Sequence, residues 1–241
     1  MNIIYIHGLD SDANSIKGSL LEEYCRQYDP DIKVLRPDLN KTPDQVFDQM
    51  LSLIDSVASK NTPDQVFDQM LSLIDSVASK NSHDQNTVLV GSSLGGYFAT
   101  LLSNHTGCPA LLLNPSIQPH QTLQRFKHST ETEDDGAKDE SANDEASEVL
   151  YTTLGGWRIT NADLRWFACH QLSSLNYPKK VVALIKEGDE LLNSSLSANF
   201  YREQGATVNM QKGGDHRFSD FKTQLPKVIE VIQQLVKGRL V

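Results

Sequence analysis

Short runs of apolar and β-branched residues alternate along this chain with longer segments in which apolar residues recur every three or four positions. A run of the first kind is typical of a strand, and a segment of the second kind is typical of an amphipathic helix. Their alternation predicts an α/β fold, with a mainly parallel sheet and helices on both faces, as a single domain over residues 1–241. The predicted strands span 2–8, 31–38, 87–91, 109–115, 179–189 and 207–214, and the predicted helices span 15–28, 42–61, 95–105, 196–205 and 218–238.

One segment occurs twice in succession, since residues 42–61 and 62–81 are identical. Each copy has the pattern of an amphipathic helix, with Pro43 or Pro63 at the first helical position. A straight helix through both copies would rotate the apolar face by about 200° between them, and Pro63 disfavours continuation across the junction. We therefore expect one copy to occupy the helix position that the fold requires and the other to be accommodated at the surface.

Residues 128–149 form a polar, acidic segment without aromatic residues. Between His128 and Glu148 there are nine acidic residues and one lysine, so this segment carries most of the formal net charge of −9. Such a composition buries too little apolar surface to offset the entropy of ordering the chain. We expect a flexible insertion in an otherwise compact domain. The alternative is an element that binds a partner or gates the site.

The composition excludes several classes of protein. Outside the acidic segment the chain is nearly neutral, which argues against nucleic-acid binding because that function requires a basic surface. No apolar stretch approaches the roughly 20 residues of a membrane span, and the first residues lack a basic leader. Cys25, Cys108 and Cys169 are few and far apart, which fits reduced thiols better than disulfides or a zinc site. We expect a cytoplasmic protein without membrane association, whose oligomeric state the sequence leaves open.

Residues 91–95 read Gly-Ser-Ser-Leu-Gly, a G-x-S-x-G motif that follows an apolar run and opens a predicted helix. This is the setting required of a nucleophile elbow, in which small neighbours let a sharp turn hold the serine out from the sheet. The N–H groups at the start of the helix favour negative charge beside that serine. Ser93 is therefore the candidate nucleophile, and the alternative is a serine that only caps the helix.

A serine hydroxyl needs a base that a third group orients. Asp189 ends one predicted strand and His216 lies just past another, and sites in α/β proteins lie at the carboxyl ends of the strands. The order Ser93, Asp189, His216 is that of α/β-hydrolases. The alternatives are that Asp189 only caps a turn, with Glu190 or Asp215 as the acid, and that His216 is a surface histidine.

An oxyanion formed during acyl transfer needs hydrogen-bond donors. The sequence offers two backbone amides, that of Leu94 directly after the serine and that of Leu9 in the loop after the first strand. Gly8 lets this loop approach closely. We expect His7 to shape the loop rather than to act as a base.

Three aromatic residues, Trp157, Trp166 and Phe167, lie between the serine and the acid in the chain. Packing within helices is the expected role of all three. The alternative is that they form the hydrophobic wall of a pocket for the acyl group of a substrate.

Five blocks occur in the order YIHGLDS, VGSSLGGYFAT, LLLNPSIQP, EGDELL and GGDHRF. As a set they resemble the small bacterial YqiA/YcfP-type esterases of the α/β-hydrolase superfamily, over nearly the whole chain except one of the identical copies and the acidic segment. The resemblance implies a minimal α/β-hydrolase fold without a large cap, with Ser93 as nucleophile, Asp189 as acid and His216 as base. The chain departs from the pattern at Asp215, whose carboxylate we expect to raise the pKa of the adjacent imidazole. It also departs in the acidic segment, which falls where hydrolase lids usually lie.

Together these features predict a serine hydrolase that cleaves carboxylic esters or thioesters through an acyl-enzyme on Ser93. Its expected partner is a small-molecule acyl ester or thioester, and the reaction requires neither a metal nor an organic cofactor. Two alternatives use the same residues: transfer of the acyl group to an acceptor other than water, and cleavage of an amide. A third is a non-catalytic protein that binds a basic partner through the acidic segment.

Overall fold

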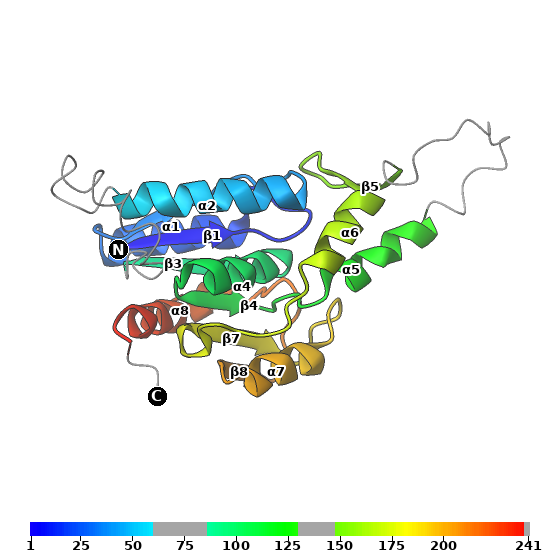
Figure 1. The fold of residues 1–241 in the computed structure, drawn as a ribbon. Coiled ribbons are helices and arrows are strands. Elements are labelled where there is room, and N and C mark those ends of the chain that lie inside the picture. The colour runs from blue at the N-terminus through cyan, green and yellow to red at the C-terminus, as the bar shows by residue number, and fades with distance from the viewer. Residues whose placement is uncertain (60–85, 130–147, 239–241) are drawn as a thin grey trace, which may run out of the picture.

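The computed structural model describes residues 1–59, 86–129 and 148–238. Its centre is a six-stranded sheet of order β2-β1-β3-β4-β7-β8, in which every neighbouring pair of strands is parallel (Figure 1). This confirms the mainly parallel α/β fold that the alternating pattern predicts. The strands are β1 (Asn2–Ile6), β2 (Lys33–Leu35), β3 (Thr87–Ser92), β4 (Ala110–Leu113), β7 (Val181–Lys186) and β8 (Thr207–Gln211).

Helices cover both faces of this sheet. Two of them, α1 and α8, pack together on one face, and α2, α4 and α7 pack on the other. Each predicted helix is therefore present within a few residues of its expected bounds. The observed helices are α1 (Ile16–Tyr28), α2 (Pro43–Ser59), α4 (Leu94–Thr106), α7 (Ser194–Glu203) and α8 (Phe221–Val236).

The strands are apolar on both faces because each face has its own layer of helices. Side chains alternate between the two sides of a strand. In β1, Ile3 and Tyr5 therefore join the core beneath α1 and α8, whereas Ile4 and Ile6 join the core beneath α2 and α4. Two cores on opposite sides fix the register of the central strands, since a slip by one residue would exchange them.

The segment of the chain between β4 and β7 forms a small layer of short helices and a hairpin. This layer lies beyond the carboxyl ends of the strands (Figure 1). The sequence pattern does not predict its hairpin, because each of the two strands is very short. Trp166 and Phe167 pack on Phe98 of α4, as expected for helical residues. The elements are α5 (Pro119–Thr122), a 3-10 helix (Leu123–Ser129), the antiparallel pair β5 (Val149–Thr152) and β6 (Arg158–Thr160), α6 (Asn161–Cys169) and a 3-10 helix (Pro178–Lys180).

Helix α2 is formed by the first of the two identical copies. Its buried residues Val46, Met50 and Ile54 lie one turn apart and pack in the core beside α4. The first copy therefore fills the helix position that the fold requires. The second copy, residues 62–81, lies outside the described residues, as does most of the acidic segment predicted over 128–149.

The three cysteines are free thiols, of which Cys25 and Cys108 are buried and Cys169 is exposed. None of the helices in the described parts of the chain combines the length and the hydropathy that crossing a bilayer requires. The core is thus assembled without cross-links between these cysteines.

Deletion of residues 62–81 is expected to leave the fold intact. The first copy already supplies every buried contact of α2. The deletion shortens the connection between α2 and β3 roughly fourfold, which changes the free energy of loop closure by only about 1 kcal/mol. Urea denaturation of the deletion variant should give a free energy of unfolding within about 1 kcal/mol of the full chain. Loss of cooperative unfolding in the variant would contradict this.

Candidate active site

Ser93 lies in the turn between β3 and α4, with φ 57° and ψ −120°. A non-glycine residue rarely adopts this conformation, and it persists only where the surroundings enforce it. The neighbouring glycines explain why the turn is possible. A Cβ at Gly91 would lie 2.3 Å from the carbonyl oxygen of Gly95, and a Cβ at Gly95 would lie 2.1 Å from that of Ile6. The strand and the helix therefore approach more closely than any side chain would permit.

Three side chains predicted to work together are in contact at this turn. The Oγ atom of Ser93 lies 2.8 Å from Nε2 of His216, and Nδ1 of His216 lies 2.8 Å and 2.9 Å from the two oxygens of Asp189. The side chains of His216 and Asp189 are only 10% and 2% exposed, so little water competes for these bonds. The tautomer that satisfies both contacts has Nδ1–H donating to Asp189 and the serine hydroxyl donating to Nε2.

Ser93 is also the residue at the N-terminal cap position of α4, which was the alternative reading of the motif. Its side chain makes no capping hydrogen bond, however, and is directed to His216 instead. The position is that of a cap, but the hydroxyl is not used as one.

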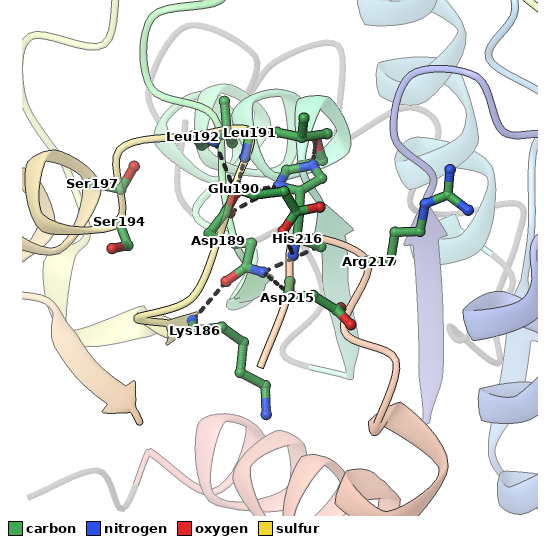
Figure 2. Close-up of polar contacts among 12 residues, drawn as sticks. Lys186, Asp189, Glu190, Leu191, Leu192, Ser194, Ser197, Asp215, His216 and Arg217 are labelled. Atoms are coloured by element: carbon green, nitrogen blue, oxygen red, sulfur yellow. Dashed lines mark hydrogen bonds and ion pairs between the residues drawn. The ribbon is translucent and has the colours of Figure 1, made fainter. Parts of the chain in front are cut away.

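The three acidic residues near His216 have different partners (Figure 2). Asp189 contacts the imidazole and also accepts from the amides of Leu191 and Leu192 at 2.9 and 2.8 Å, so it caps a turn as well. Glu190 accepts from the backbone N–H of His216 at 2.9 Å. Of the three, only Asp189 contacts the ring.

Asp215, the neighbour of His216 in the sequence, makes its hydrogen bond elsewhere. Its carboxylate accepts from the amide of Ser219 at 3.0 Å, and its side chain points away from the ring of His216 (Figure 2). Hydrogen bonds from Ser219 hold the pKa of Asp215 below its usual value. The carboxylate thus stabilises the loop and is not a substitute for Asp189.

Asn114 is a further residue of the site that sequence reasoning missed. It directly follows β4, is 2% exposed and has a positive φ of 43°. Its Nδ2 donates to the carbonyl oxygens of Asp215 and His216 at 3.0 and 3.2 Å, and its Oδ1 accepts from the amide of Lys186 at 2.8 Å. One buried amide therefore ties the loop that carries the histidine to the ends of β4 and β7.

Lys186 supports the same loop from below. It is 3% exposed, and its Nζ binds Asp220 at 2.6 Å and lies 4.5 Å from the centre of the Phe218 ring. Gly214 packs on its aliphatic stem, since a Cβ at that glycine would lie 2.6 Å from Cδ of the lysine. Lys186 of β7 therefore contacts the histidine loop both before His216 and after it in the chain.

The loop after β1 lies against Ser93, as its predicted role requires. A Cβ at Gly8 would lie 3.1 Å from Cβ of Ser93. The ring of His7 holds the loop, because Nδ1–H donates to the carbonyl of Gly8 at 2.9 Å and Nε2 accepts from the amide of Leu39 at 3.0 Å. Both nitrogens are occupied by the backbone, so His7 shapes the loop as expected.

A cavity opens beside Ser93, between the loop after β1 and the start of α4. Trp157 lies in its wall, whereas Trp166 and Phe167 pack within the core and do not line it. Leu9 and Leu94, the two residues whose amides are predicted to hold an oxyanion, both line it. Within the described ranges, no group of three or more His, Cys, Asp or Glu side chains is placed to hold a metal ion.

Chemically, this arrangement is suited to nucleophilic attack. A hydroxyl that donates to an imidazole can lose its proton as it attacks, and a carboxylate on the other ring nitrogen stabilises the resulting cation. The first N–H groups of a helix have no partner within the helix, so the start of α4 favours negative charge next to the serine.

A family model described as "Uncharacterised protein family (UPF0227)" matches this chain over residues 2–66 and 56–233. The two matches together cover most of the chain. Their overlap, at residues 56–66, lies within the duplicated segment.

Solved structures of the same architecture include Est1E from Butyrivibrio proteoclasticus with ferulic acid bound, at 14% identity, TM-score 0.68, and coverage of 98% of this chain and 89% of that chain. Alpha/beta hydrolase domain-containing protein 10 from mouse matches at 20% identity and TM-score 0.54, over 97% and 90% of the two chains. The ydeN gene product from B. subtilis matches at 14% identity and TM-score 0.53, over 98% of each. At these identities the likeness shows the fold, which is that of the α/β-hydrolases.

Replacement of Asn114 by alanine is expected to lower the free energy of unfolding by about 2–3 kcal/mol, because it leaves one buried carbonyl, one partly buried carbonyl and one buried amide without partners. Urea denaturation measures this. Asn104→Ala is the matched control, since Asn104 also bonds to backbone groups, of Ser174 and Asn176, but at an exposed position. Its loss should cost less than about 1 kcal/mol, because water replaces the amide. Equal losses in the two variants would contradict the role given to Asn114.

Proposed function

The chain belongs to the uncharacterised protein family UPF0227, which confirms the resemblance to YqiA/YcfP-type proteins, and on this premise we propose that it is a serine hydrolase. It cleaves carboxylic esters or thioesters through an acyl-enzyme on Ser93. The observation that carries the proposal is the chain of contacts from Ser93 through His216 to the buried carboxylate of Asp189.

In the first step of the proposed mechanism, the hydroxyl of Ser93 attacks the acyl carbonyl while His216 Nε2 accepts its proton. The 2.8 Å contact between these two atoms supports direct transfer. Asp189 holds the ring through Nδ1–H and stabilises the imidazolium. Because the ring and the carboxylate are shielded from water, the stabilisation is stronger than it would be at an exposed pair.

The oxyanion of the tetrahedral intermediate is assigned to the amides of Leu94 and Leu9. Leu94 is the first residue of α4, where N–H groups have no helical acceptor. Leu9 follows Gly8, whose backbone lies against Ser93. Both donors belong to backbone that is already fixed before substrate binds, so little reorganisation accompanies the reaction.

In the second half of the reaction, His216 returns the proton to the leaving alcohol or thiol. A water molecule then attacks the acyl-enzyme with the same base and the same oxyanion donors. The protein's own residues supply every group in this sequence, so the proposal involves no metal and no organic cofactor.

The substrate is proposed to be a small molecule. The cavity beside Ser93 is of the concave, mostly apolar kind that small ligands occupy. Ferulic acid, a small carboxylic acid, is bound in the structurally similar Est1E. Free thiols at all three cysteines support the cytoplasm as the proposed location.

Labelling with a fluorophosphonate probe tests the nucleophile. The wild type should become labelled and should hydrolyse p-nitrophenyl esters, and Ser93→Ala should do neither, because the probe reacts only with an activated serine. Ser92→Ala is the control at the adjacent buried position and should still be labelled. Unchanged labelling of Ser93→Ala would refute the assignment.

Substitutions in the acid and the base should lower kcat far more than they change KM. His216→Ala and Asp189→Asn are each expected to reduce kcat by about 10⁴-fold, since the first removes the base and the second leaves it in the wrong tautomer. Steady-state ester hydrolysis measures both.

Asp215→Asn is the matched control for Asp189→Asn, because its carboxylate binds the amide of Ser219 and not the imidazole. It should change kcat by less than about threefold. A loss comparable to that of Asp189→Asn would show that the wrong acid had been chosen.

A further inference from the structure

The cavity beside Ser93 is narrow and has rigid walls. Its empty volume of about 310 Å³ includes open solvent, so the enclosed space is well below the roughly 300–1,000 Å³ of typical small-molecule sites. Three large apolar residues of the lining come from three different elements and belong to the packed core, so they yield little. They are Val46 of α2, Phe98 of α4 and Trp157, which directly precedes β6.

The two polar side chains of the lining that belong to His7 and Asn40 are already engaged with the protein. Both ring nitrogens of His7 are bonded to backbone groups. The side-chain nitrogen of Asn40 donates to Ser11 and Asp38 at 2.9 and 2.8 Å, and its oxygen accepts from the hydroxyl of Thr153 at 3.3 Å. Neither side chain is therefore free to recognise a polar substituent on a ligand. The other lining side chains are apolar except for the indole N–H of Trp157, which is buried without a hydrogen-bond partner among the described residues.

We propose that this cavity is the acyl subsite of the enzyme, that it accepts short, apolar acyl chains, and that Trp157 sets its depth. The inference rests on the proposed function. Its lining includes Leu9 and Leu94, whose amides are proposed to bind the oxyanion, so the chain attached to that carbonyl carbon lies next to the cavity.

Trp157 is held in the lining of the cavity by the hairpin that carries it. The amide of Trp157 donates to the hydroxyl of Thr153 at 3.0 Å, and its carbonyl accepts from the amide of Thr153 at 2.8 Å. The hairpin is in turn fixed to the loop after β1, since Asp10 accepts from the hydroxyl of Tyr151 at 2.9 Å and from the amide of Leu154 at 3.1 Å. The depth of the cavity and the position of Leu9 thus depend on the same contacts.

In the reaction, the new bond joins Ser93 Oγ to the acyl carbon, and the bond from that carbon to the alcohol oxygen breaks. The alcohol leaves with the proton that His216 took from the serine. Only the acyl chain remains on the enzyme, so the cavity selects on its length irrespective of the leaving group.

The test is a series of p-nitrophenyl esters from acetate to octanoate, which share one leaving group. For the wild type, kcat/KM should fall by at least about tenfold between butanoate and octanoate, because a longer chain must displace core side chains. Trp157→Phe should raise the ratio of kcat/KM for hexanoate to that for acetate by about tenfold. This corresponds to room for about two further methylene groups, each worth about fourfold.

The duplicated segment provides a matched control for Val46, the lining residue that α2 contributes. The double variant Val46→Ala with Val66→Ala keeps the two copies identical and should also shift the preference toward longer chains. Val66→Ala alone makes the same substitution at the equivalent position of the second copy and should leave the preference unchanged, since α2 is formed by the first copy.

Fluorophosphonate labelling of each variant separates the possible failures. If Ser93 is labelled but the chain-length ratio does not respond to Trp157→Phe or to the double variant, the subsite assignment is wrong and the hydrolase proposal stands. A shift caused by Val66→Ala alone, or a wild type that prefers octanoate, would also overturn the assignment. Absence of labelling that depends on Ser93 in the wild type would overturn both.

Discussion

The contact between the end of β3 and the first turn of α4 is the constraint on which the rest of the site depends. The helix begins directly after Ser93 and runs back over the strand that precedes it, which requires a positive φ at the serine. Gly91 and Gly95 leave no room for any side chain between them. Because this turn has no space to relax, the fold itself places Oγ of Ser93, and the other groups are positioned relative to it.

The loops around the serine are held mainly by bonds to their backbone. Asn114 ties the histidine loop to β4 and β7, Glu190 accepts from the amide of His216, and His7 fixes the loop after β1. These bonds act on main-chain atoms, so they restrict where a loop lies without engaging its functional side chain. Such support is what a site needs if its distances are to be set before substrate binds.

Much of this organisation could be predicted from the sequence, for reasons that are physical. The strands are apolar on both faces and the helices on one, so the two periodicities separate clearly. The order of Ser93, Asp189 and His216 along a parallel sheet brings all three to one edge. The hairpin of β5 and β6 could not be predicted, because strands of three and four residues carry too little pattern and Tyr151 and Leu154 are bonded to Asp10, far away in the chain.

Asn114 was missed for a different reason. In the sequence it stands before Pro115 and reads as an ordinary turn residue. Its importance comes from burial and a left-handed backbone, which direct its amide toward three main-chain groups distant in sequence. The roles of Asp189, Glu190 and Asp215 likewise follow from the directions of their side chains, which sequence order does not determine.

The duplication has a consequence for how this chain chooses its native state. Residues 42–61 and 62–81 offer the same side chains to one place on the sheet, so packing there does not discriminate between them. Neighbouring residues therefore decide which copy forms the helix. Leu39 and Asn40 lie just upstream of the first copy and are hydrogen-bonded to His7 and Ser11, which favours the first copy. In their own side chains the two copies are degenerate, and only these upstream anchors separate them. Any later substitution in one of them would end that degeneracy and turn the other into the preferred helix or into surplus chain.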